Sequence, residues 1–433
     1  MAARQGYARG RVAAIIVALS GALVMSACTA PVGSSVDYRQ VDAPLPDDVA
    51  QQLDDVLASA VRLSGSSGGV AGVWSPWSGS WTGAVGTVGF DEGAAKVTPD
   101  TEFRLTTVTS EVTCTVLARL VDAGVVKYED QVADLVRSLP GVEGITLDQL
   151  CRNTSGLADY YPALRHAFVT NPERVWPVRE LVASGMAEKR AGAPGTQWSY
   201  SRTGVLLLGL ALEQRTGRSM SDLADQYVFG PLGMESTTLP SPDVTAKPAG
   251  ALGGYSASPV GGGKVDCAVV LDVSRQSSSM GGAAAGAVST LDDTKRLSEA
   301  FATGELLTEA TARDVWNTVP PGATSPSWYA QGLGGMEFGP MRGSAGEAPG
   351  ALTAAITDPE TGLTVVIALN NSSSGAEFVR QVAFALASIG SKAQPASDRE
   401  LPLVELPWSL EQATANMEQL AVCPTPEEPA AEG

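Results

Sequence analysis

Strand-like segments lie near both ends of this chain and enclose a middle that is patterned for helices. Near the start, residues 69–74 and 81–90 are apolar or alternating and flank a Ser-Pro-Trp-Ser-Gly turn at 75–79. Near the end, residues 351–357 and 363–369 flank an Asp-Pro-Glu-Thr-Gly turn. Two hairpins separated by a helical region predict an α+β fold in which the two chain ends build one antiparallel sheet.

Four segments carry the apolar spacing of three to four residues that is typical of helices. They are residues 47–63, 107–124, 203–216 and 377–388. The third segment is apolar on nearly every side, so we expect it to be buried all round.

The first residues have the pattern of an export signal. Three arginines precede an apolar run over residues 12–25, which is too short to span about 30 Å of hydrocarbon comfortably. The run ends in Met-Ser-Ala-Cys, which resembles a bacterial lipobox with Cys28 as the lipid-modified mature N-terminus. We therefore expect residues 1–27 to be a lipoprotein signal peptide and the protein to be lipid-anchored at the outer face of the cytoplasmic membrane. An ordinary secretory signal with cleavage nearby is the alternative.

Polar segments border the expected fold on both sides. Residues 28–46 are rich in Ser, Pro, Asp and Gln and predict a disordered tether. Residues 391–433 form a C-terminal extension, and its acidic, proline-rich end from Pro424 predicts a second disordered tail. Residues 47–390 remain as one domain that is long enough for a large core.

Charge and the scarcity of histidine exclude several functions. The formal net charge is −18, and loss of the three leader arginines makes it −21, which argues against nucleic acid and anionic lipid headgroups as partners. A Ser-His-Asp triad could use only His166, and histidine-rich metal sites are excluded. The sequence has no Cys-x-x-Cys spacing for zinc. We expect no metal and no cofactor.

Four cysteines remain besides Cys28, namely Cys114, Cys151, Cys267 and Cys423. In an oxidising compartment they allow three disulfide pairings. Buried free thiols are the alternative, because a domain of this size does not depend on disulfides.

Several short motifs occur in a recognisable order along the chain. They are Phe-Arg-Leu-Thr-Thr-Val-Thr-Ser at 103–110, Ile-Thr-Leu-Asp-Gln-Leu at 145–150, Asn-Thr-Ser-Gly-Leu at 153–157, Trp-Ser-Tyr-Ser-Arg-Thr-Gly at 198–204, Phe-Gly-Pro-Leu-Gly-Met at 229–234 and Ala-Gly-Ala-Val-Ser-Thr at 285–290. Together with residues 343–350 and the C-terminal hairpin, this order resembles the class C β-lactamase, penicillin-binding protein and D-alanyl-D-alanine carboxypeptidase family over roughly residues 47–389. The resemblance implies a β-lactamase/transpeptidase-like fold, with an antiparallel sheet flanked by helices and a helical subdomain.

The nucleophile motif of that family, Ser-x-x-Lys, is altered in this chain. Nearly one helical turn separates the two family residues, so the lysine ammonium lies beside the serine hydroxyl and helps to deprotonate it. The matching positions here are Thr107 and Ser110, and no Ser-x-x-Lys occurs anywhere in the sequence. A threonine hydroxyl could attack, although it is more crowded, but Ser110 has no cation with which to activate it.

A second family motif, Tyr-x-Asn, keeps its tyrosine as Tyr200 and has Arg202 in place of the asparagine. The resemblance implies a phenol that shuttles a proton and an amide that both donates and accepts hydrogen bonds. A guanidinium only donates and is always charged, so it cannot replace that amide.

The third family motif is a Lys/His-Thr/Ser-Gly strand that binds the substrate carboxylate. It matches Ser344, Ala345 and Gly346, where both the cation and the hydroxyl-bearing residue are changed, and Glu347 adds a negative charge nearby. Sliding the frame by two residues would instead place the Arg-Gly-Ser triplet that begins at Arg342 on this strand and would restore a cation.

The resemblance also favours one disulfide. If it holds, the helix that begins near Thr107 and the segment 147–153 line one cleft, and Cys114 then lies near Cys151.

Three altered motifs leave little covalent turnover, because catalytic groups of this kind act as a unit. We therefore expect a pseudoenzyme, a binding or scaffolding protein of the cell envelope whose old cleft takes a peptidoglycan peptide or a cell-envelope protein. The alternative is an active esterase, D-alanyl-D-alanine carboxypeptidase or β-lactamase with Thr107 or Ser110 as the nucleophile and Tyr200 as the base. A purely structural surface protein is a third hypothesis.

Overall fold

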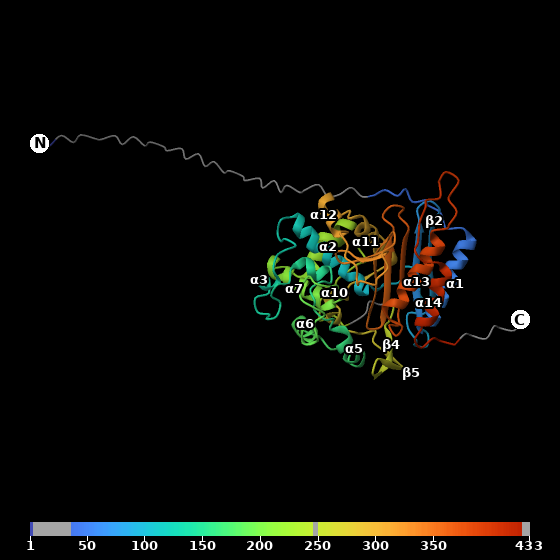
Figure 1. The fold of residues 1–433 in the computed structure, drawn as a ribbon, viewed down its shortest axis with the longest axis horizontal. Helices are drawn as coiled ribbons and strands as arrows, with labels where there is room; N and C mark the ends of the chain where they lie inside the picture. Colours follow the sequence, from blue (N-terminus) through green and yellow to red (C-terminus); the bar gives the residue numbers. More distant parts are fainter. Residues whose placement is uncertain (3–35, 246–249, 427–433) are drawn as a thin grey trace.

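The computed structural model describes residues 1–2, 36–245 and 250–426 (Figure 1). The main sheet of this part of the chain is antiparallel, with the strand order β2-β1-β11-β10-β9-β8-β7. Its strands are β1 (Gly68–Ser75), β2 (Gly79–Gly86), β7 (Tyr329–Gln331), β8 (Met336–Phe338), β9 (Met341–Ala348), β10 (Ala351–Thr357) and β11 (Thr364–Leu369). Strand β1 of the N-terminal hairpin pairs with β11 of the C-terminal hairpin, from Gly69 opposite Leu369 to Trp74 opposite Thr364. The prediction that both chain ends build one antiparallel sheet is confirmed.

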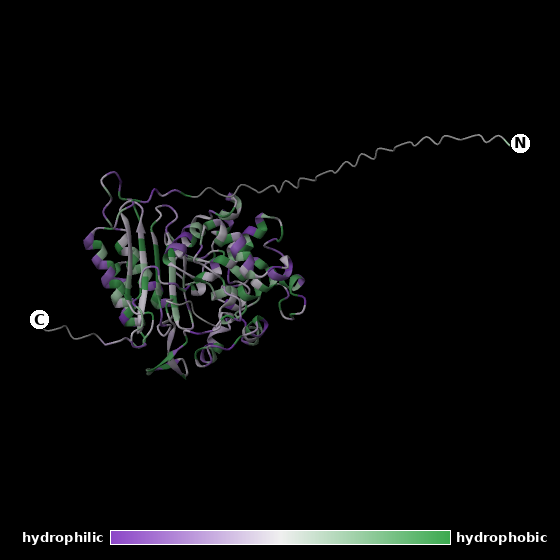
Figure 2. Cartoon of the chain, turned by 180° about the vertical axis from the view of Figure 1, so that it is seen from behind, coloured by the Kyte–Doolittle hydropathy of each residue, from purple (hydrophilic) through white to green (hydrophobic). Residues whose placement is uncertain are grey.

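Three helices cover one face of this sheet, α1 (Asp47–Ser64), α13 (Gly375–Gly390) and α14 (Leu410–Leu420) (Figure 1). The apolar spacing of α1 puts Val49, Leu53 and Leu57 on one side, where they join a buried cluster with the sheet and with α13. The other side of α1 is hydrophilic and faces outward (Figure 2).

The opposite face of the sheet carries the helical region. Helix α7 (Arg202–Thr216) is buried continuously from Arg202 to Leu212, in agreement with its apolar sequence. The other helices and turns of this region are η1 (Thr106–Val108), α2 (Thr109–Asp122), α3 (Val132–Leu135), α4 (Leu147–Cys151), α5 (Tyr161–Thr170), α6 (Val178–Ala187), α8 (Met220–Ala224), η2 (Asp225–Phe229), α9 (Gly230–Leu232), η3 (Ser278–Met280), α10 (Gly282–Ala285), α11 (Leu291–Thr303) and α12 (Glu309–Val315).

Two short strand pairs complete the structure. β3 (Phe103–Arg104) pairs with β6 (Val288–Ser289), and β3 lies directly before η1 in the chain. β4 (Tyr255–Gly261) and β5 (Lys264–Asp272) form a hairpin at the edge of the molecule (Figure 1).

The N-terminal hairpin is shorter than the sequence predicts. We expected its second strand to continue to residue 90, but β2 ends at Gly86. Gly86 has a φ of 80°, a left-handed conformation that turns the chain out of the sheet and that glycine adopts without a steric penalty.

Part of the predicted tether packs against the sheet. The amide of Val41 donates to the carbonyl of Pro76, and the amide of Leu45 donates to that of Ser80. Leu45 is only 2% exposed. Composition predicted disorder because it averages over the segment, whereas one well-placed leucine is enough to hold residues 41–46 on the sheet.

The C-terminal extension also packs, through α14. This helix buries Ala413 and Met417 in the cluster that contains α1 and α13. A disulfide between Cys267 and Cys423 then joins β5 to the chain just after α14. The predicted disordered tail from Pro424 lies mostly outside the described residues, as do Cys28 and nearly all of the predicted signal peptide.

No helix within residues 36–245 and 250–426 combines the length and the apolar character that crossing a membrane requires.

Candidate functional site

A cavity of about 180 Å³ opens where η1 and the start of α2 meet strand β9. Its lining includes every residue that the altered motifs single out, namely Thr107, Ser110, Tyr200, Arg202, Ser344, Ala345 and Gly346. The structure thus brings together seven positions that the sequence distributes over three separate segments.

Thr107 lies in η1 and faces β9 closely. A Cβ added to Gly346 would lie 1.5 Å from the Thr107 hydroxyl oxygen, so this hydroxyl packs directly on the strand. The preceding residue, Thr106, has a φ of 51°, which is a strained conformation for a β-branched residue. The backbone is therefore strained directly before Thr107, whose side chain lines the cavity.

Ser110 stands where the family lysine would be, and its hydroxyl is engaged by the backbone of α10. Its Oγ donates to the carbonyl of Ala284 in α10 at 3.0 Å. Thr113, one turn further along α2, donates in the same way to Ala283. Ser110 is thus part of the contact between α2 and α10, and it offers no base to Thr107.

Glu111 lies beside the cavity, close to Ser344 of its lining, and our sequence reasoning missed it. It is fully buried in α2, and its carboxylate oxygens make no hydrogen bond of good geometry with any described residue. Burial raises the pKa of Glu111 to about 8, although the nearby Ser344 hydroxyl opposes the shift. The sequence signal that could have identified Glu111 is an acidic residue within the apolar helical segment 107–124.

Tyr200 is half-buried beside Thr107, and its hydroxyl oxygen is buried. Burial raises the pKa of its hydroxyl to about 12, while the Arg202 guanidinium counteracts part of the shift. Thr107 is also close enough to lower the pKa of Tyr200, but the two hydroxyls do not reach good hydrogen-bond geometry. Tyr200 is therefore a neutral phenol at pH 7.

Arg202 is committed to protein partners. Its Nη1 forms an ion pair with Asp159, and its Nη2 donates to the carbonyl of Glu347 at 3.0 Å. The guanidinium also lies 4.2 Å from the ring centroid of Tyr161. Asp159, which the sequence reasoning did not single out, thus holds in place the guanidinium of Arg202, the residue at the position of the family asparagine.

Strand β9 presents Ser344, Ala345 and Gly346 to the cavity, as in the first of the two frames considered. Arg342, the cation of the shifted frame, is outside the lining. Its guanidinium lies 4.5 Å from the ring centroid of Trp316 and pairs with Glu337. The shifted frame therefore supplies no cation to this cavity.

Arg380 is a cation of the cavity that the sequence reasoning missed. It comes from α13, pairs with Glu377 and donates from Nη1 to the Tyr329 hydroxyl at 3.1 Å. Its side chain is 22% exposed, more than the 6% of Arg202. Arg380 is therefore the more accessible of these two cations.

Asn153 ties the tyrosine segment to the opposite wall of the cavity. Its Oδ1 accepts from the amide of Ser201, and its Nδ2 donates to Gln331 Oε1 at 3.2 Å. Trp198 donates to the same oxygen of Gln331. This network holds the segment of Tyr200 against strand β7.

A disulfide joins Cys114 of α2 to Cys151 of α4, with the two Cα atoms 5.9 Å apart. Cys151 also lines the cavity, so the bridge fixes the start of α2 to the cavity wall. The described part of the chain contains no group of three or more His, Cys, Asp or Glu residues arranged to hold a metal ion.

Known proteins resemble this chain in sequence and in fold. A sequence model of the Beta-lactamase family matches residues 65–387. A D-aminopeptidase from Cereibacter sphaeroides is 32% identical over 212 residues, which make up 48% of this chain and 39% of that protein. This chain therefore spans well under half the length of that relative.

Solved structures show the same fold. A D-stereospecific amidohydrolase from Streptomyces sp. superposes with a TM-score of 0.67 at 26% identity and covers 78% of this chain and 98% of its own. A penicillin binding protein from Bacillus halodurans superposes with a TM-score of 0.61 at 20% identity, covering 73% of this chain and 95% of its own. The interval matched in sequence contains the sheet, the helical region and the lining of the cavity, and on this evidence the chain belongs to the beta-lactamase family.

Proposed function

We propose that this chain is a binding protein of the cell envelope that retains the family cleft, has lost covalent catalysis and is anchored by lipid at Cys28. The observation that carries the proposal is Ser110 at the position of the family lysine: it has no amine, and its hydroxyl donates to the carbonyl of Ala284.

The remaining groups do not replace the missing base. A hydroxyl must lose its proton during attack, and this needs an acceptor within reach. Tyr200 is a neutral phenol, since its pKa is about 12, and Arg202 is occupied by Asp159. Loss of such a base costs several powers of ten in rate.

The ligand that fits best is a short peptide that carries a D-residue. The relatives named above are a D-aminopeptidase and a D-stereospecific amidohydrolase. Arg380 gives the cavity an accessible cation for a ligand carboxylate, and Tyr329 and Phe338 give it apolar walls. A peptidoglycan stem peptide that ends in D-Ala-D-Ala has this chemistry, and a cell-envelope protein remains the other partner class.

Calorimetric titration of the protein with a pentapeptide ending in D-Ala-D-Ala tests the proposal. We expect binding without release of D-alanine, and weaker binding of the matching peptide that ends in L-Ala-L-Ala. Arg380→Gln should weaken binding about tenfold. The matched control is Arg313→Gln, on an exposed arginine of α12 that is outside the cavity, and it should leave the affinity unchanged. Release of D-alanine, or equal affinity for the two peptides, would refute the proposal.

An active hydrolase is the second candidate, because Tyr200 is retained next to Thr107. In that case Thr107 attacks and its proton passes to Tyr200 in the phenolate form, which a pKa of about 12 makes scarce at pH 7. A stoichiometric acyl adduct on Thr107 after incubation with a fluorescent penicillin, located by peptide mass mapping, would favour this candidate over the first.

A further inference from the structure

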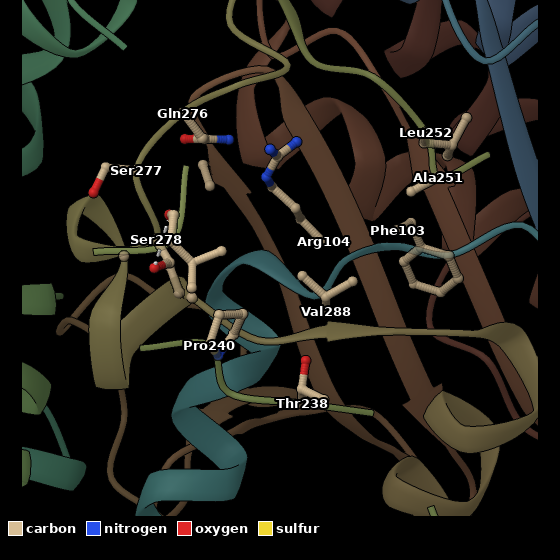
Figure 3. Close-up of a pocket in the computed structure, with 15 residues that line it drawn as sticks. Phe103, Arg104, Thr238, Pro240, Ala251, Leu252, Gln276, Ser277, Ser278 and Val288 are labelled. Carbon is tan, nitrogen blue, oxygen red and sulfur yellow. Dashed lines mark hydrogen bonds between the residues drawn. The ribbon is translucent and has the colours of Figure 1, made fainter. Parts of the chain in front are cut away.

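A second cavity, of about 210 Å³, is formed by β3, η3, α10, β6 and the loops beside them (Figure 3). It shares no lining residue with the cavity at Thr107. Ala348, at the end of β9, is the point where it approaches the strand that lines the first cavity.

Arg104 of β3 brings a positive charge into this second cavity. Its Nη2 donates to the carbonyl of Ser274 at 2.7 Å, which occupies only part of a guanidinium that has five N–H donors. Within residues 36–245 and 250–426, Arg104 forms no ion pair, in contrast to Arg202 with its partner Asp159. Burial lowers the pKa of Arg104 to about 10, and Asp272 opposes the shift from a distance. The cation is thus half-buried and has no directly paired anion among the described residues.

The surroundings of Arg104 divide into a polar end and an apolar wall. Gln276 lies at the same end of the cavity as the guanidinium in Figure 3, and its Nε2 donates to the carbonyl of Pro349. Phe103, Leu252 and Val288 supply apolar surface. A ligand with one charged end and an apolar body matches this division.

We propose that this cavity binds a small organic carboxylate, with the carboxylate paired to Arg104 and the apolar body against Phe103, Leu252 and Val288. The planar fork of a guanidinium matches the two oxygens of a carboxylate. A phosphate dianion fits less well, because one cation would leave part of its charge buried and unpaired. This site uses no residue of the proposed peptide cleft, so the two proposals can be tested independently.

Phenylacetate and its neutral counterpart phenylacetamide are suitable probes, because they share an apolar ring and differ in charge. Calorimetric titration of the purified full-length protein should show binding of phenylacetate and weaker or no binding of phenylacetamide. Arg104→Gln should weaken phenylacetate binding at least about tenfold, through loss of a charge-assisted pair. Arg104→Lys keeps the positive charge but loses the paired N–H donors of the guanidinium. Its affinity for phenylacetate should therefore lie between those of the unmodified protein and Arg104→Gln.

Arg313→Gln is the matched control, because it removes an exposed cation that lines neither cavity and should leave phenylacetate binding unchanged. Circular dichroism and thermal melting establish that each variant is folded. If Arg104→Gln does not fold, two measurements still test the proposal: phenylacetate binding by Arg104→Lys, and the comparison of phenylacetate with phenylacetamide on the unmodified protein. Equal affinity for acid and amide, unchanged binding in both Arg104 variants, loss of binding in Arg313→Gln, or no binding at millimolar phenylacetate would overturn the proposal.

Discussion

The hydroxyl of Ser110, one turn after Thr107, donates to the carbonyl of Ala284 in α10. In a site built on Ser-x-x-Lys, the side chain at this position turns toward the nucleophile and accepts its proton. Here it holds two helices together, and the consequences for catalysis can be measured.

We expect no acyl-enzyme with penicillins and no nitrocefin turnover above a Thr107→Ala, Ser110→Ala control. Restoring the motif as Thr107→Ser with Ser110→Lys should give only weak activity, because Arg202 and Ser344 remain in place of the family residues. Intact mass after incubation with a fluorescent penicillin measures the adduct. A stoichiometric adduct on the unmodified protein, mapped to Thr107 or Ser110, would show that covalent chemistry survives.

Gly346→Ala should destabilise the protein by about 1–3 kcal/mol, because the added Cβ would overlap the Thr107 side chain. Thr107→Ala removes the hydroxyl oxygen and methyl group but keeps the Thr107 Cβ, which would lie 2.7 Å from the new atom, so the double variant should be only partly rescued. Urea unfolding of all four proteins gives the coupling energy. Additive effects would mean that the strand and η1 move apart freely.

Arg202→Met should destabilise the protein by about 3–5 kcal/mol, since it leaves the carboxylate of Asp159 buried and unpaired. The side chains of Arg202 and Asp159 are only 6% and 12% exposed. Arg313→Gln breaks a pair whose side chains are 67% and 88% exposed, and it should change stability by no more than about 1 kcal/mol. Similar losses in the two variants, measured by urea unfolding, would contradict the structural role assigned to Arg202.

Glu111 should make stability fall as pH rises. Its pKa is raised from 4.5 to about 8 in the folded protein, so between these values the folded chain holds a proton that the unfolded chain has released. The contribution of this group therefore weakens stability by up to about 1.4 kcal/mol per pH unit in that window and levels off above it. Glu111→Gln should remove this dependence. The free energy of unfolding of the variant should therefore rise relative to that of the unmodified protein from pH 5 to pH 8. Urea midpoints that shift in parallel for both proteins would exclude the assignment.

Cys28→Ala should release the protein from membranes, because the proposed lipid anchor requires this thiol. Fractionation of cells that express either form, followed by immunoblotting, measures the distribution. Equal membrane retention of the two forms would refute lipidation at Cys28.

The sequence by itself determined the sheet hairpins, the main helices and the loss of three catalytic motifs. These features are local, because a strand, a helix or a missing lysine can be read within a few neighbouring residues. The hairpins at 69–86 and 351–369 and the buried helix at 203–216 are where the pattern predicts them, apart from the early end of β2.

Only the tertiary structure decided which partners these residues meet. Arg202 pairs with a carboxylate 43 residues away, whereas the carboxylate of Glu111 has no hydrogen-bond partner among the described residues, although nothing in the local sequence distinguishes their fates. The frame of β9, the packing of residues 41–46 and α14, and the separate Arg104 cavity also depend on contacts between distant segments. Periodicity records which side of an element is apolar, whereas charge pairing and desolvation depend on what the rest of the chain places opposite it.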